Sequence, residues 1–247
     1  MDRESKSETG GAALEVVIAR EPRDVEAAQR LRYRVFGEEL GAVLPSAPSG
    51  LDQDGFDPFC DHLLVRHATS GDVVGPYRIL PAERARDAGG FYTATEFDLG
   101  RLVELPGLVE VGRACIDPRF RTGGVLALLW AGLAAHLRTR GYEHVMGCAS
   151  LPAHDPREAA DACARLLRDH GAPHEWRVTP FRPLSLEGAS ATTPRPLPPL
   201  VRGYLRMGAS VCGPPAWDPA FRTADVVMVL PMHRLERRFA SRFRRAA

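Results

Sequence analysis

The stretch of residues 109–150, VEVGRACIDPRFRTGGVLALLWAGLAAHLRTRGYEHVMGCAS, decides the fold of this 247-residue chain. Short apolar residues recur between 109 and 116 and predict a strand, which Asp117-Pro118 ends. Apolar residues then follow at helical spacing from Val125 up to Gly141, a usual residue just beyond a helix. Residues 143–149 predict a second, buried strand. The stretch is therefore expected to form a strand–turn–helix–strand unit.

The turn in the middle of this unit is basic and rich in glycine. Arg121, Gly123 and Gly124 directly precede the predicted helix. The free N–H groups and the positive dipole end of a helix N-terminus attract an anionic group, and glycine lets the backbone approach it closely. The turn is therefore a candidate anion site, although an ordinary strand-to-helix turn would have a similar composition.

The composition is that of an ordinary globular protein. Hydrophobic residues make up 45% and charged residues 26%, and a net charge of +1 gives no general attraction to nucleic acid. No apolar run is long enough to span a membrane, and the polar first ten residues lack the apolar core of a secretory signal. Five cysteines without a Cys-x-x-Cys pair indicate reduced thiols and no zinc site. We expect a cytoplasmic protein that binds neither nucleic acid nor a metal.

Periodicity around the central unit predicts one α+β domain over residues 13–232, after a disordered segment 1–12. Helices are expected at 22–40, 156–170 and 200–209. Strands are expected at 14–19, 62–67, 72–80, 174–179, 210–213 and 224–230.

Charged residues outside the unit suggest a substrate site. Asp54, Asp57 and Asp61 belong to an acidic loop that could bind a cation or an ammonium group, although aspartate is also common in turns. Arg78 lies in an apolar strand and needs a partner if it is buried. Among the arginines at 30, 32 and 34 of the first helix, two are expected to face solvent.

Residues 233–247 are predicted to form a basic amphipathic tail. Leu235, Phe239 and Phe243 fall on one face, among six arginines. Such a helix could rest on anionic lipid at the inner face of the membrane. The alternative is a solvated tail whose phenylalanines dock on the core.

The unit at 109–150 resembles the central motif of the GNAT superfamily of N-acyltransferases, although Leu126 stands where that superfamily's turn carries glycine or alanine. Two series of motifs sharpen the resemblance. Residues 31–36 (LRYRVF), 54–57 (DGFD), 75–81 (GPYRILP) and 110–113 (EVGR) are similar to the acyl-homoserine-lactone synthases. Residues 59–65 (FCDHLLV), 90–98 (GFYTATEFD) and 203–208 (GYLRMG) resemble the ornithine-lipid N-acyltransferases, the more specific match.

This resemblance implies a GNAT-like α+β fold with a mixed, mostly antiparallel central sheet flanked by helices. It also implies an enzyme that transfers a 3-hydroxyacyl group from acyl carrier protein to the α-amine of L-ornithine and holds no bound cofactor. The departure in the turn agrees with a carrier-protein donor, which presents phosphopantetheine without a nucleotide pyrophosphate.

The same resemblance assigns roles to residues. Glu110 is expected to accept the proton of the attacking amine, with Arg113 beside it in the catalytic set. Glu110 is also a candidate structural partner of Arg113, two residues further along the strand, and the two roles are compatible. Backbone N–H groups near Cys115 and Ile116 would stabilise the oxyanion. The two cysteines Cys115 and Cys148 are expected to be core residues rather than nucleophiles. The substrate-binding set is Arg32, Phe36, Asp54, Asp57, Asp61 and Arg78, and the acyl-pantetheine set is Ile116, Arg121, Gly123 and Gly124.

Two other functions stay open from the sequence. One is an acyl-homoserine-lactone synthase, or an N-acyltransferase acting on another amino acid such as glycine. The other is a peripheral membrane-binding module without catalysis, which would have no need of Glu110, Arg113 and Arg78 together.

Overall fold

The computed structural model describes residues 13–121, 124–189 and 196–235. The segment 1–12 and the part of the predicted tail beyond residue 235 lie outside the described residues. None of the helices within these ranges is both long and apolar enough to cross a bilayer.

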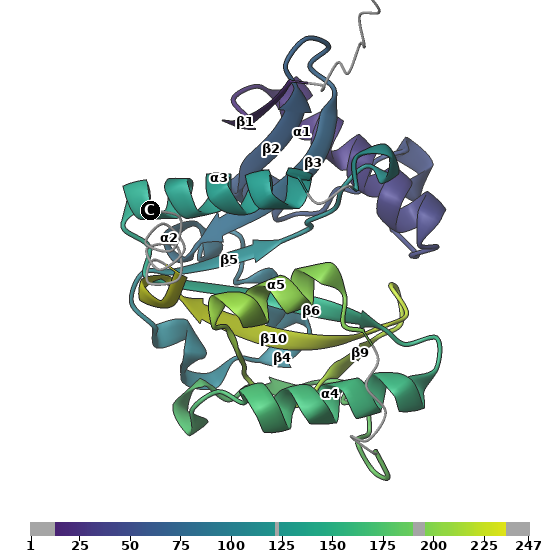
Figure 1. Cartoon of the computed structure of the whole chain (residues 1–247), viewed down its shortest axis with the longest axis vertical. Coiled ribbons are helices and arrows are strands. Elements are labelled where there is room, and N and C mark those ends of the chain that lie inside the picture. The colour runs from purple at the N-terminus through teal and green to yellow at the C-terminus, as the bar shows by residue number, and fades with distance from the viewer. Residues whose placement is uncertain (1–12, 122–123, 190–195, 236–247) are drawn as a thin grey trace, which may run out of the picture.

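The expected α+β architecture is confirmed. One sheet has the strand order β1-β2-β3-β5-β6-β10-β8, and β9 also pairs with β10 (Figure 1). All its described pairs are antiparallel except β5 with β6. The strands are β1 Leu14–Ile18, β2 Asp61–His67, β3 Val73–Pro81, β5 Leu108–Gly112, β6 His144–Pro152, β8 Ser210–Val211, β9 Ala216–Asp218 and β10 Thr223–Pro231.

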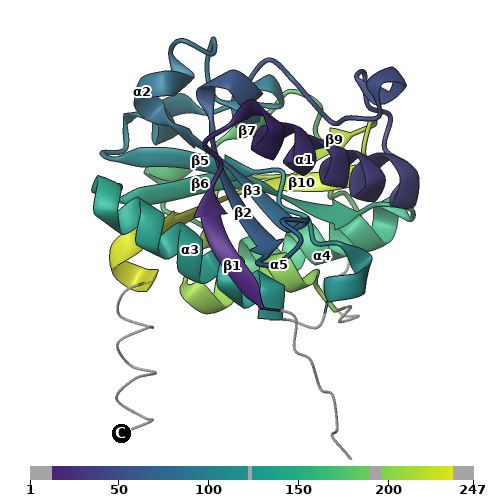
Figure 2. The same cartoon turned by 90° about the horizontal axis from the view of Figure 1, so that it is seen from above.

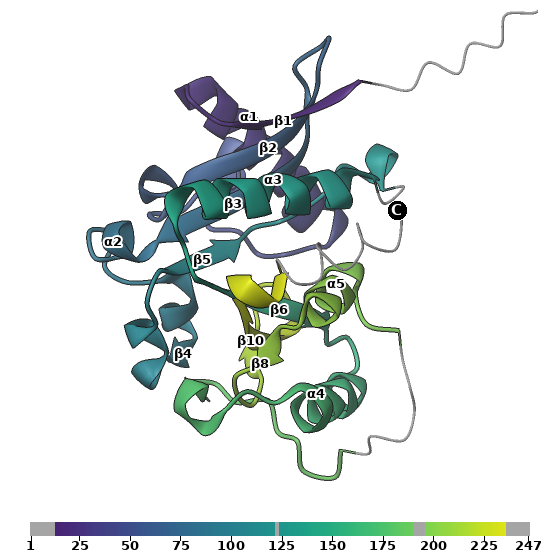
Figure 3. The ribbon, with the colours of Figure 1, turned by 60° about the vertical axis from the view of Figure 1, so that its left-hand side comes forward.

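Helices cover both faces of this sheet. Figure 2 shows α1 (Pro22–Arg32) and α2 (Ala82–Ala85) on one face, and α3 (Gly124–Arg140), α4 (Pro156–His170) and α5 (Pro199–Met207) on the other. A second, two-stranded sheet of β4 (Phe97–Asp98) and β7 (Thr179–Pro180) lies on the α2 side, away from α4 and α5 (Figure 3). The larger core cluster packs β-sheet residues against α3, α4 and α5.

The parallel strands β5 and β6 pair only at their beginnings, from Leu108 opposite His144 to Glu110 opposite Met146. At the next position of β6, a Cβ on Gly147 would lie 2.3 Å from the carbonyl oxygen of Val111. Glycine therefore permits a close approach of the two backbones at this point. Beyond it the strands separate, and the gap between them positions the site described below.

Several expected elements differ in the structure. The strand expected at 109–116 ends at Gly112, because Arg113 has a φ of 53° in the left-handed region, which breaks strand geometry. The strand expected at 174–179 is wrong over most of its length, because His174–Trp176 form a 3-10 turn and β7 begins only at Thr179. The helix expected to reach residue 40 changes to a π-helix over Tyr33–Glu39. The short strand β9 was not predicted, since it has few residues to show a period.

The first residues of the predicted tail belong to the folded domain. Leu235 is buried in the large core, and Arg234 donates a hydrogen bond of 2.9 Å from Nη1 to the carbonyl oxygen of Gly208, just after α5. The basic side chain therefore satisfies a free carbonyl at the end of a helix.

Candidate functional site

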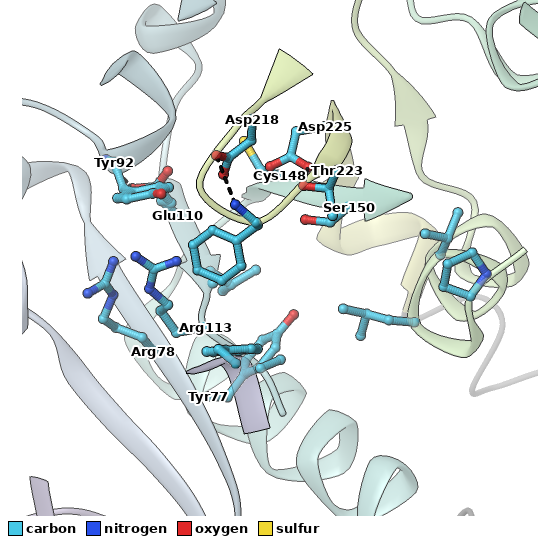
Figure 4. A pocket seen from close by; sticks show the side chains of 18 of the residues that line it. Tyr77, Arg78, Tyr92, Glu110, Arg113, Cys148, Ser150, Asp218, Thr223 and Asp225 are labelled. Atoms are coloured by element: carbon cyan, nitrogen blue, oxygen red, sulfur yellow. Dashed lines mark hydrogen bonds between the residues drawn. The ribbon is translucent and has the colours of Figure 1, made fainter. Parts of the chain in front are cut away.

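A cavity of about 330 Å³ lies where β5 and β6 separate. It reaches both faces of the sheet, because Tyr77 on its wall belongs to the core under α3 and α5, whereas Leu80 belongs to the core on the opposite face. Figure 4 shows Glu110 and Tyr92 across the cavity from Ser150. Of the predicted site residues, Phe36, Arg78, Glu110 and Arg113 line this cavity.

A second cavity of about 720 Å³ adjoins the first. The two share the lining residues Tyr92, Arg113, Asp218 and Phe221. Asp54, from the predicted acidic loop, lines the second cavity only. Two reactants could therefore approach the shared wall from different sides.

Glu110 projects from β5 into the first cavity and is only 5% exposed. Its Oε2 accepts a hydrogen bond of 2.7 Å from the backbone N–H of Tyr92, and its Oε1 accepts bonds from the backbone N–H and the hydroxyl of Thr93. Burial raises the pKa of Glu110, although the bonds from Thr93 and Tyr92 oppose that rise. The candidate structural pairing of Glu110 with Arg113 is wrong, because strand geometry ends between them and each finds other partners.

The predicted arginines and loop acids form one buried network. Arg32 is 1% exposed and binds Asp57 with both terminal nitrogens, at 2.9 and 2.8 Å. Its Nε also lies 2.9 Å from Oδ2 of Asp52. Arg78 binds Asp54 at 2.6 Å and Asp57 at 3.1 Å. Arg32 therefore holds the acidic loop in place but lines neither cavity. Arg78 also holds the loop, and it lines the first cavity.

Arg113 is part of the wall that the two cavities share, and it lies beside this network. Its guanidinium lies 4.8 Å from the ring centre of Tyr92 and 5.1 Å from that of Phe221. Its nearest carboxylates are more distant than those of Arg32, with Asp52 at 3.5 Å and Asp54 at 3.6 Å. Its buried Nε has no hydrogen-bond partner among the described residues. Arg113 is thus a cation with donor capacity left for an anionic group.

Asp61 is separate from the other predicted acids. It begins β2 and is bound by Arg84 at 2.8 Å and by His136 of α3 at 3.0 Å. The hydrogen bond from His136 lowers the pKa of Asp61 to about 2, with Arg84 acting in the same direction against burial. Neither cavity is lined by Asp61. The structure therefore gives this residue a structural role.

The predicted anion turn lies at the start of α3. Arg121 donates from Nε to the carbonyl oxygen of Ile116 at 3.0 Å and forms a two-pronged ion pair with Glu39, at 2.5 and 2.7 Å. Gly124 is the first residue of α3, and Gly123 lies outside the described residues. An anion at this turn would compete with Glu39 for Arg121.

Three carboxylates of the site were missed by the sequence reasoning. Glu96 lines the second cavity, Asp225 the first, and Asp218 both. One oxygen each of Glu96 and Asp225 and the sulfur of Cys148 lie within 4.8 Å of one another. Asp225 could have been found from the sequence, because it is a lone acid inside the apolar strand β10. The same reasoning identified Arg78 as a charged residue in an apolar strand.

The cysteines have the character of core residues. All five are free. Burial raises the pKa of Cys115 to about 12 and holds that of Cys148 well above its ordinary value of 9.0. Both thiols therefore stay protonated at neutral pH and are poor nucleophiles.

Known proteins resemble this chain over most of its length. Residues 31–131 match the family described as "Acetyltransferase (GNAT) domain". A protein of Rhizobium meliloti (strain 1021), named L-ornithine N(alpha)-acyltransferase, is 39% identical over 92% of this chain and 83% of its own length. A protein of the same name from Brucella abortus (strain 2308) is 37% identical over 93% and 88%.

Solved structures share the fold at low identity. The AHL synthase LasI has a TM-score of 0.54 and 14% identity, covering 90% of this chain and 91% of that one. The CoA-dependent acyl-homoserine lactone synthase BjaI has a TM-score of 0.54 and 16% identity, covering 92% and 87%.

Proposed function

Because the chain belongs to the family of L-ornithine N(alpha)-acyltransferases, we propose that it transfers a 3-hydroxyacyl group from acyl carrier protein to the α-amine of L-ornithine. The observation that carries this proposal in the structure is the cavity between β5 and β6, which joins an apolar side under α5 to a charged side at Glu110 and Arg113. A long acyl thioester fits the first side and a zwitterionic amino acid the second.

The acceptor amine must lose a proton before it can attack. Glu110 is the proposed acceptor of that proton, directly or through one water molecule. Among the described residues, its Oε2 accepts one hydrogen bond, from the backbone N–H of Tyr92, and so keeps a lone pair for the amine. The raised pKa of the buried carboxyl brings it nearer to neutral pH, which suits a general base.

The amine nitrogen then attacks the thioester carbon, and the carbonyl oxygen becomes an oxyanion. The backbone N–H groups of Cys115 and Ile116, just beyond the left-handed Arg113, are the proposed donors to that oxygen. As the carbon–sulfur bond breaks, the nitrogen gives up its second proton to the leaving pantetheine thiolate, which leaves a neutral amide and a thiol. Glu110 releases to solvent the proton that it took from the ammonium group. No covalent enzyme intermediate is needed, in agreement with the protonated cysteines.

Arg121 and the start of α3 are the proposed site for the phosphate of the pantetheine arm. A carrier-protein donor brings one phosphodiester there instead of a nucleotide pyrophosphate, which agrees with Leu126 in place of the usual small residue. The lipid product is expected to form in the cytoplasm, at the inner face of the membrane.

The test is acyl transfer by the purified protein, from 3-hydroxyacyl carrier protein and from the matching CoA thioester, to a panel of amines. Mass spectrometry should detect N-acyl-ornithine with the carrier-protein donor. Glu110→Gln should lower kcat by about 100-fold or more, with Asp98→Asn at an exposed strand end as the control. Detection of an acyl-homoserine lactone or of acyl-glycine would show that the acceptor is not ornithine. The absence of transfer from either donor would refute the catalytic role.

A further inference from the structure

The carboxylates missed by the sequence differ from the loop acids in their partners. Asp52, Asp54 and Asp57 all lie against arginine side chains. Glu96, Asp218 and Asp225 form no ion pair with any of the described residues. Oε2 of Glu96 is buried with no hydrogen-bond partner among them, and Asp225, 4% exposed, accepts a bond of 2.8 Å from the hydroxyl of Thr223.

These three acids repel one another across the two cavities. Burial first, and then the charges of Asp225 and Asp218, raise the pKa of Glu96 to about 8. Burial, with Asp218 adding to it, likewise raises the pKa of Asp225 to about 6, although the hydroxyls of Thr223 and Ser150 oppose the rise. Arg113 is the cation that acts on both, and it is engaged with the loop acids. The anionic charge of this wall therefore lacks a full counter-charge.

A second polar group without a partner lines the first cavity, on the face of the sheet opposite Asp225. The hydroxyl of Tyr77 is buried in a side chain only 2% exposed, and it has no hydrogen-bond partner among the described residues. Tyr77 lines the first cavity together with Asp218 and Asp225 (Figure 4). A buried hydroxyl without a partner is destabilising, so a ligand in this cavity has both a charged wall and an unused hydroxyl to bind.

An ammonium group suits this wall better than a metal ion. The third group beside Glu96 and Asp225 is the thiol of Cys148, whose raised pKa keeps it protonated. A metal ion would have to displace that proton in order to bind the thiolate. A substrate ammonium, in contrast, needs only carboxylate oxygens as acceptors.

We propose that Glu96, Asp225 and Asp218 bind the side-chain ammonium group of the amino-acid acceptor and so select a diamino acid over a neutral one. This inference rests on the proposed N-acyltransferase function. Arg113, on the shared wall, binds the α-carboxylate of the same acceptor, which leaves its α-amine at Glu110. The loop acids Asp54 and Asp57, expected from the sequence to bind the ammonium, already have their charges balanced by arginine.

The experiment compares two acceptors of nearly equal size, L-ornithine and L-norvaline, which lacks the terminal amine. The wild-type protein should prefer ornithine strongly. Glu96→Gln and Asp225→Asn should each lower kcat/KM for ornithine by about 30-fold or more, as for a lost buried charge pair, while kcat/KM for norvaline stays the same or rises. Glu104→Gln, at an exposed carboxylate outside both cavities, should leave both values unchanged.

Binding gives a readout that does not depend on catalysis. Ornithine should raise the thermal unfolding midpoint of the wild-type protein at about pH 8, where Glu96 is half ionised, and this rise should be lost in both variants. An equal loss of activity with ornithine and norvaline would overturn the proposal, because the acids would then serve the chemistry or the fold. Failure of the wild-type protein to acylate ornithine, before any substitution, would instead refute the proposed function.

Discussion

Asp57→Asn should destabilise the protein more than any change at an exposed ion pair. Asp57 accepts hydrogen bonds from Arg32 at 2.9 and 2.8 Å, from Arg78 at 3.1 Å and from Gln29 at 3.0 Å. Both arginines are buried. The substitution keeps the shape of the side chain but removes the negative charge that the two buried arginines share. It also places an amide N–H donor where a guanidinium needs an acceptor.

The magnitude follows from the burial of the pair. Removing one partner of a buried ion pair costs about 3–5 kcal/mol. Asparagine keeps one acceptor oxygen, so we expect the lower end, about 3 kcal/mol in the free energy of unfolding. At about 2–4 °C per kcal/mol for a domain of this size, the unfolding midpoint should fall by roughly 6–12 °C.

Urea titration and thermal unfolding measure this change. The control is Glu26→Gln, which removes an exposed pair with Arg30 and should cost less than about 0.5 kcal/mol. Burial alone would raise the pKa of Asp57, but Arg32 and Arg78 together outweigh burial and hold this pKa below its ordinary 3.8. The stabilising charge is therefore present above that pH and is lost as the pH falls further. The difference between wild type and variant should therefore shrink in acid. A loss below about 1 kcal/mol at neutral pH would refute the reasoning.

Three other predictions test the electrostatics and packing of the site. The pKa of Glu96 in the folded protein is about 8 against an ordinary 4.5, so the wild type should lose stability as the pH rises between these values, by up to about 1.4 kcal/mol per pH unit. Urea titrations across this range should show a flatter dependence of stability on pH for Glu96→Gln, and equal slopes for the two proteins would contradict the assignment. Gly203→Ala would place a Cβ 1.4 Å from the ring of Trp130, so calorimetry should record a loss of about 1–3 kcal/mol or more, and an unchanged midpoint would mean that the indole moves freely. Arg121→Gln should raise KM for the acyl donor by about 10-fold with little change in kcat. Glu39→Gln frees Arg121 from its ion pair and should lower this KM in the same steady-state assay. If neither variant changes KM, the phosphate binds elsewhere.

Local patterns in the sequence were sufficient for most elements. The helix expected at 156–170 has those bounds as α4, because its apolar period and flanking residues are local signals. The strand–turn–helix–strand order at 109–150 was likewise predictable, as was the need of Arg78 for a partner. Left-handed backbone at Arg113 was not, since arginine carries no local preference for it.

The chemistry of the site depended on contacts between distant segments. The sequence placed Asp54, Asp57 and Asp61 together as one acidic loop, but α1 supplies Arg32 to Asp57 and α3 supplies His136 to Asp61. Pairing of β10 with β6 brings Asp225 beside Cys148, and the segment around Glu96 packs over both. Residue spacing therefore determined which side chains each helix or strand presents. The order of the strands in the sheet decided which charges are neutralised and which face the cavity, because the charged residues and their partners are far apart along the chain.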